Sequence, residues 1–166
     1  MTDAALFERG VGGRRSDRFT FVAPLTLILL VLSQPALGQA PDLAWEEVFG
    51  GSEGERGLAL LETRGSGLIV AGYTASKGAG GRDLLLIKTD SEGEMEWERT
   101  IGGPADDEGW AVLEARDGGY LVAGVTEPPG SEGTELWLVK TYSDGYERWK
   151  ETFGGPGDDW GVAVLE

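Results

Sequence analysis

Tryptophan recurs in this chain at a fixed interval: Trp45, Trp97 and Trp149 are each 52 residues apart, and the sequence around them repeats without a gap. The first two copies are identical at 22 of 52 aligned positions. A fixed period of this size is typical of repeat architectures, in which each unit buries its apolar face against its neighbours. The copies cover residues 45–96, 97–148 and, in part, 149–166.

Each tryptophan opens a motif that ends on two glycines: W-E-E-V-F-G-G, W-E-R-T-I-G-G and W-K-E-T-F-G-G. Both full copies continue with V-A-G-x-T and then with L-x-L-[IV]-K-T. We interpret the tryptophans and the paired glycines as structural positions of the repeat. These positions are Trp45, Trp97, Trp149, Gly50, Gly51, Gly102, Gly103, Gly154 and Gly155.

Short runs of β-branched, aromatic and leucine residues alternate with turn-forming segments, which predicts an antiparallel β architecture. The strands predicted in the first repeat are Leu58–Thr63, Leu68–Thr74, Leu84–Asp90 and Met95–Gly102. The second and third are almost continuously apolar and should be covered on both faces, whereas the fourth alternates and should lie at an edge. We predict an all-β fold: β-propeller blades of four antiparallel strands, two of them full and the others partial, in an incomplete ring.

Particular glycines and tryptophans should mark where blades meet. A tryptophan on the outer strand can cover the seam between adjacent blades, so we expect Trp97 and Trp149 to pack there rather than to stack on a ligand. Gly93 and Gly145 each precede a tryptophan by four residues and should supply the positive φ of a hairpin turn. Glycine inside an apolar strand suggests close approach between blades, which we predict for the equivalent positions Gly72 and Gly124.

The order W-x3-[FI]-G-G, an acidic pair, V-A-G-x-T and L-x-L-[IV]-K-T resembles the β-propeller repeats of about fifty residues found in secreted bacterial and archaeal proteins. The likeness covers residues 45–166. A glycine four residues before tryptophan is also distantly similar to the blades of quinoprotein dehydrogenases. The resemblance implies an architecture and no particular activity, because propellers host many unrelated functions.

Ring closure needs about four to eight blades, so two blades leave apolar seams open. The chain should begin on a lone outer strand, Trp45–Gly50, suited to completing the last blade of a ring. It should end inside an inner strand, Val162–Glu166. These features indicate a fragment of a longer chain that holds the missing blades, or else a subunit whose seams close in a homo-oligomer.

Residues 1–40 have the composition of a secretory signal peptide, followed by the repeat region 41–166. Arg14, Arg15 and Arg18 precede an apolar run, Phe19–Leu32, and small residues follow it. The run is shorter than the roughly 20 residues of a spanning helix, and the alternative is an uncleaved N-terminal membrane anchor. We predict a secreted, periplasmic or cell-surface protein.

Charge and composition limit the function. The formal net charge is −15, which disfavours nucleic acid as a partner. The chain has no histidine and no cysteine, so the common nucleophile–base pairs cannot be assembled. We predict no catalytic residues, no cofactor, and a binding or interaction scaffold with a protein or glycan partner. The alternatives are the scaffold part of a larger secreted enzyme, a hydrolase or quinoprotein-like, and a carbohydrate-binding module with Tyr73, Trp110 or Trp160 exposed.

Acidic residues that follow the double glycines are the candidates for a metal site. A ring of Asp106, Asp107, Asp158 and Asp159 could hold Ca²⁺, which prefers oxygen ligands. The alternative is that they accept backbone N–H bonds in tight turns. Two equivalent lysines, Lys88 and Lys140, either form a binding ring or pair with nearby carboxylates.

Overall fold

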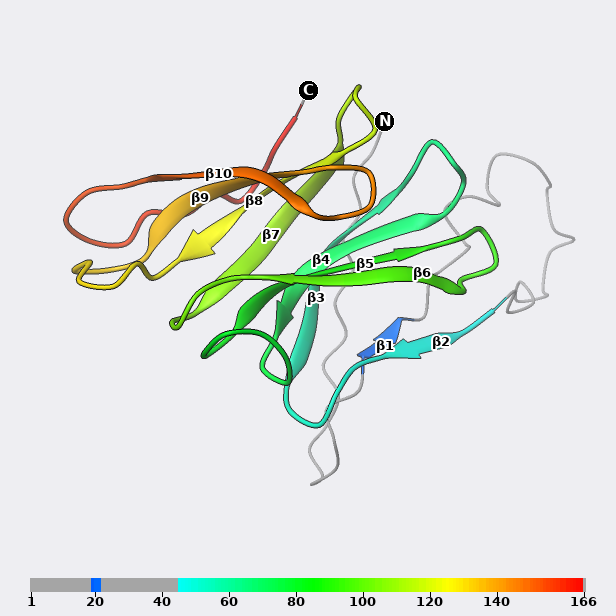
Figure 1. Cartoon of the computed structure of the whole chain (residues 1–166), viewed down its shortest axis with the longest axis horizontal. Coiled ribbons are helices and arrows are strands. Elements are labelled where there is room, and N and C mark those ends of the chain that lie inside the picture. Colours follow the sequence, from blue (N-terminus) through cyan, green and yellow to red (C-terminus); the bar gives the residue numbers. More distant parts are fainter. Residues whose placement is uncertain (1–18, 22–44, 166) are drawn as a thin grey trace, which may run out of the picture.

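A computed structural model describes residues 19–21 and 45–165 of the chain, and this part is all β, with no helix. It contains two four-stranded antiparallel sheets and one two-stranded sheet (Figure 1). The two larger sheets are consistent with propeller-like blades, and they do not form a closed ring. The strands are β1 (Phe19–Phe21), β2 (Glu47–Phe49), β3 (Glu55–Glu62), β4 (Leu68–Thr74), β5 (Asp83–Thr89), β6 (Met95–Ile101), β7 (Asp107–Glu114), β8 (Tyr120–Thr126), β9 (Glu135–Thr141) and β10 (Glu147–Phe153).

Each large sheet is a simple meander, β3-β4-β5-β6 in the first and β7-β8-β9-β10 in the second, so Trp97 and Trp149, which open repeats, lie on the last strand of the preceding sheet. The strand predictions are confirmed, although β3 begins three residues earlier than expected, at Glu55. Every residue of β5 is buried, and β4 is nearly so, as their apolar sequences predicted. The alternating fourth strands lie at the edges: β6 is mostly half-buried or exposed, and every residue of β10 is exposed.

The predicted contact between repeats is present at Gly124, because a methyl group on Gly161 of the third copy would be 3.5 Å from the Gly124 nitrogen, but the atoms nearest to Gly72 and Gly124 lie in their own sheets. Each lies opposite a β-bulge in its own sheet, where the register shifts between Gly57 and Ala59 and again one repeat later. A methyl group on Gly72 would lie 1.8 Å from the carbonyl oxygen of Arg56, and one on Gly124 would lie 1.9 Å from the equivalent carbonyl. The bulge pushes a backbone carbonyl towards the neighbouring strand, and only glycine leaves room for it.

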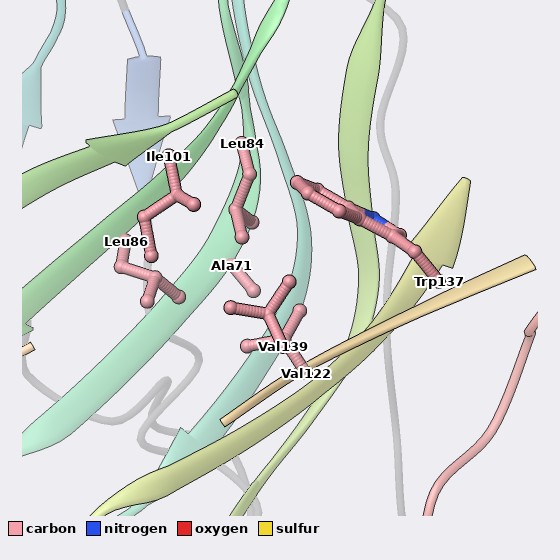
Figure 2. Packing of buried hydrophobic residues seen from close by; sticks show 7 residues of the cluster. All are labelled: Ala71, Leu84, Leu86, Ile101, Val122, Trp137 and Val139. Carbon is pink, nitrogen blue, oxygen red and sulfur yellow. The ribbon is translucent and has the colours of Figure 1, made fainter. Parts of the chain in front are cut away.

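An apolar core lies between the two large sheets. Leu84, Leu86 and Ile101 from the first sheet meet Val122 and Val139 from the second, and Figure 2 shows these side chains pointing toward one another. Strand β7 contacts β3, β4 and β5 of the preceding sheet. The core cluster also contains Ala71 and Trp137. Since neither sheet can bury this face alone, the two repeats stabilise each other.

The predicted seam role of Trp97 is confirmed. Its ring packs against the core cluster and over Gly145 in the β9–β10 turn, where a methyl group would lie 2.5 Å from ring atom Cζ3. Trp45 covers Gly93 in the β5–β6 turn in the same way, 2.6 Å from Cε3. Both glycines have positive φ, +88° at Gly93 and +81° at Gly145. Each of these tryptophans therefore packs on a hairpin turn of the large sheet that follows it, and we call this contact the tryptophan seam.

The other face of the first sheet is covered by β2. Phe49 packs against Val70, Leu85 and Ile87, which are almost completely buried. Strand β2 pairs antiparallel with β1, whose residues 19–21 fall within the predicted signal peptide. The remainder of that predicted segment lies outside the described residues.

The predicted inner strand Val162–Glu166 is absent over the described residues 162–165. First strands pair with the second strand of their own sheet, as β3 does with β4, and none of the described residues pairs with this segment in that way. Gly161 nevertheless lies on the second sheet, and a methyl group there would be 2.1 Å from Leu136 Cδ1. Gly109 makes the equivalent contact with Leu84, at 2.3 Å. The third copy therefore begins to pack as a blade even without strand pairing.

The bulge geometry predicts the effect of adding one methyl group. We expect Gly124→Ala to lower the free energy of unfolding by about 1–3 kcal/mol, because the obstacle is a backbone carbonyl that cannot rotate away. Gly65→Ala is the matched control, since no atom lies within 4 Å of its added methyl group. Urea denaturation of both variants measures the difference. Equal stability of Gly124→Ala and the parent would contradict the bulge assignment.

Candidate functional site

The loop 102–106, which joins β6 to β7, holds the next repeat against the entry of β5. The backbone N–H of Asp107 donates to the carbonyl of Arg82 at 2.7 Å. Asp106 Oδ1 accepts the N–H of Arg82 at 2.8 Å, and Asp107 Oδ2 accepts the N–H of Gly103 at 2.6 Å. Both backbone polar groups of Arg82 are therefore satisfied by the following repeat. We call this arrangement the loop clamp.

The loop clamp recurs one period later. Asp159 donates its N–H to the carbonyl of Thr134 at 2.8 Å, and Asp158 Oδ1 accepts the N–H of Thr134 at 3.0 Å. Asp159 Oδ2 accepts the N–H of Gly155 at 2.9 Å. The same bonds thus form even where the third copy has no strand. The double glycines permit this approach: a methyl group on Gly102 would lie 2.1 Å from a carboxylate oxygen, Oδ1 of Asp83.

The structure places the four predicted metal ligands in two pairs, one at each clamp. All four residues take part in backbone hydrogen bonding there, which is the role that the turn-capping alternative assigned to them. Within residues 19–21 and 45–165, no group of three or more acidic, histidine or cysteine side chains has the arrangement to hold a metal ion. Ca²⁺ binding by Asp106, Asp107, Asp158 and Asp159 stays a prediction. A bound Ca²⁺ would compete with the backbone N–H groups for the same carboxylate oxygens.

Calcium titration distinguishes the two roles. Because the carboxylates already accept backbone N–H bonds, we expect millimolar Ca²⁺ to leave the melting temperature unchanged and to release no heat of binding. Calorimetry on the purified chain makes the measurement. A binding heat that disappears in Asp106→Asn would contradict this expectation and support the calcium hypothesis.

Asp83 is a buried carboxylate that the sequence analysis did not single out. Its side chain is 1% exposed at the start of β5, and its Oδ2 accepts the N–H of Ala79 at 3.1 Å. Burial raises the pKa of Asp83, and the nearby carboxylates of Asp107 and Asp106 raise it further, against the lowering effect of backbone N–H donors. Glu135 occupies the same position one repeat later. An acid directly before the third strand of both repeats is the signal that could have identified it.

This raised pKa predicts a pH dependence of stability. Between the ordinary pKa of an aspartate and the raised one, the folded chain binds more protons than the unfolded chain, so stability falls as pH rises through that window. We expect Asp83→Asn to raise the melting temperature at pH 7, because the amide carbonyl still accepts the Ala79 N–H bond without a buried charge. The gain should shrink below about pH 4.

Thermal melts of Asp83→Asn between pH 3 and pH 7 test this dependence. Glu135→Gln is the matched control, because Glu135 is only half-buried and its substitution should shift the melting temperature less. A gain that stays the same at pH 3 would contradict the assignment to Asp83 ionisation.

The equivalent lysines pair with carboxylates, as one of the two interpretations predicted. Lys88 and Lys140 are both 8% exposed at the ends of β5 and β9. Lys88 Nζ lies 2.9 Å from Glu96 Oε2, and Lys140 Nζ lies 2.7 Å from Asp117 Oδ1. The Lys140 ammonium holds the pKa of Asp117 below its ordinary range. These contacts join the end of each third strand to a neighbouring turn or strand.

The aromatic candidates for glycan binding differ in exposure. Tyr73 is half-buried beneath Arg82, whose guanidinium carbon lies 4.7 Å from the ring centroid. Trp110 is half-buried and donates its indole N–H to Glu108 at 2.8 Å. Trp160 is 60% exposed, and its ring centroid lies 6.4 Å from that of Trp110 at an interplanar angle of 41°. The two tryptophans, from different repeats, form a tilted pair.

A pocket of about 370 Å³ opens beside the first loop clamp. Loop residues 102–105, the β8–β9 connection at 126–129 and β10 residues 150–152 line it, together with Asp107 and Trp137. Trp137 is 2% exposed and donates its indole N–H to the carbonyl of Glu108 at 3.1 Å, which anchors this wall to β7. The lining carries three carboxylates and one lysine, which gives the pocket an acidic character.

No protein-family model matches the chain, and a search of the curated proteins found no relative. The resemblance to secreted β-propeller repeats therefore stays a prediction. Throughout the described residues, no helix has the length and apolar content needed to cross a membrane.

Proposed function

We propose that this chain is an exported, non-enzymatic β-propeller segment that binds a protein or glycan partner at the loop-bearing edge of its blades. The observation that carries the proposal is the pocket of about 370 Å³ between the first loop clamp and the second sheet. Export rests on the predicted signal peptide, and the non-enzymatic role rests on the absence of histidine and cysteine from the sequence.

Several features of the pocket suit binding. Its walls come from two loops and an edge strand at the junction of two repeats, so a ligand there would contact both repeats. Loops supported by rigid sheets are the usual place for recognition residues. Asp107, Glu127 and Glu151 outnumber Lys150 along the lining, which favours a partner with cationic groups, such as a basic peptide.

A single bulky substitution tests the pocket without disturbing the core. Thr152 lines the pocket from the exposed strand β10, so Thr152→Trp should fill the space and weaken binding at least tenfold. Thr100→Trp is the matched control, because Thr100 is also exposed, occupies the equivalent position on β6 and does not line the pocket.

Peptide and glycan arrays probed with the purified chain and both variants make this measurement. A ligand that Thr152→Trp loses and Thr100→Trp retains would support the proposal. No binding on either array, or equal binding by both variants, would contradict it.

The tilted tryptophan pair favours a second candidate, a carbohydrate-binding module. Aromatic faces stack on sugar rings, and Trp160 presents 60% of its surface beside Trp110. Trp160→Ala should then abolish binding on the glycan array while Thr152→Trp leaves it unchanged. The opposite pattern would assign binding to the pocket.

A further inference from the structure

On the outward face of the second sheet, Gly161 lies over Leu136, but the tryptophan contact that Trp45 and Trp97 make is missing. Trp45 packs on Gly93 and Trp97 packs on Gly145, but among the described residues nothing occupies the corresponding place over Trp149. Trp149 is 41% exposed and Phe153 is 50% exposed. Side chains alternate along a strand, so these two residues share one face of β10.

The chain itself shows what covers a face of this kind. On the first sheet, Trp45 and Phe49 sit over Gly93 and over the apolar side chains of β4 and β5. In the repeat, Trp149 and Phe153 are the residues equivalent to Trp45 and Phe49. The exposed strand of the second sheet is therefore chemically matched to the surface that β2 now occupies.

We propose that a second copy of this chain docks head to tail on this face, with β10 of one copy taking the place of β2 in the next. Trp149 would then pack on Gly93, and Phe153 on the Val70, Leu85 and Ile87 cluster of the receiving copy. The inference rests on the proposed assignment of the repeats as propeller blades. It commits to a second copy because the receiving surface is already present in the chain.

The greater length of β10 favours its replacement of β2 on the receiving copy. Within the part of the chain that the structure describes, strand β2 has three residues and pairs with the short strand β1 alone, whereas β10 has seven residues and is held along most of its length by β9. Docking β10 brings the whole second sheet with it, including the half-buried Leu138 of β9. The residues around Gly161, which now lie over Leu136, move away so that β3 of the receiving copy takes their place. Removal of the exposed Trp149 and Phe153 side chains from water would be the main driving force of association.

Head-to-tail contact uses two different surfaces, so it either closes into a ring or continues into a filament. Each copy supplies two sheets, and propeller rings contain about four to eight blades. A closed ring would accordingly contain two to four copies.

Light scattering on the purified chain tests the docking. We expect a mass of two to four times the 17.7 kDa of one chain, or a larger mass that grows with concentration if the ring stays open. Trp149→Ala should return the protein to the mass of one chain. Trp45→Ala is the matched control: it loosens the competing β2 and should leave the mass unchanged or raise it.

A parent protein that stays at the mass of one chain up to about 100 µM would overturn the proposal. So would an equal loss of association in both tryptophan variants, since that result indicates nonspecific adhesion. Far-UV circular dichroism checks that Trp149→Ala folds, and if it does not, Phe153→Ser on the same exposed face replaces it.

The mass measurement and the array measurement fail independently. Thr152 lies on the opposite face of β10 from Trp149, so Thr152→Trp should keep the oligomer intact. If the chain associates but binds no ligand on the arrays, the docking proposal is supported and the proposed binding function is contradicted. If the chain binds a ligand but remains a monomer, the binding function is supported and the docking proposal is contradicted.

Discussion

Burial of one sheet face against the next repeat is the constraint on which the rest of the structure depends. Leu84 and Val122 are completely buried, yet each belongs to a sheet that would expose that side chain if it stood alone. Gly109 makes the approach possible because any larger residue there would meet Leu84. The first strand of one repeat can therefore lie directly on the preceding sheet, and stability is shared between neighbouring repeats.

Two further contacts, one polar and one aromatic, then set the order and spacing of the sheets. The loop clamp ties the backbone of Arg82 to the start of the next repeat, and the tryptophan seam fixes the turn that contains Gly145. One contact lies at the loop end of the strands, and the other lies near the β9–β10 turn. Together they hold adjacent sheets in one relative position and create the acidic pocket beside the clamp.

Much of this fold could be predicted from the repeat, because period and strand pattern are properties of local sequence. The apolar runs of β4 and β5 identified the covered strands, and the alternating sequence of β6 identified an edge. The role of Gly72 could not be read in the same way: a bulge depends on which carbonyl lies opposite, and that follows from pairing rather than from composition. Residues 162–165 form no strand for a related reason, since a strand needs a partner and none of the described residues pairs with them.

Prediction of the candidate site was less complete. The sequence pattern draws attention to the acidic pairs 106–107 and 158–159, but whether a carboxylate faces a metal or a backbone N–H depends on where Arg82 and Thr134 lie. Asp83 was overlooked because its burial arises from two segments that are not adjacent to it in a simple pattern, the loop at Gly78 and Gly102 of the following repeat. The pocket combines segments from residues 102–152, and no local pattern shows that they meet.

The loop clamp holds Arg82 and Thr134 by their main-chain atoms, so the side chains at these two positions differ while the bonds remain the same. After duplication of a repeat, the residue at this position of the loop clamp can therefore change without disturbing how adjacent repeats pack. Such changes, one in each copy, are a route by which a tandem duplication acquires new binding specificities.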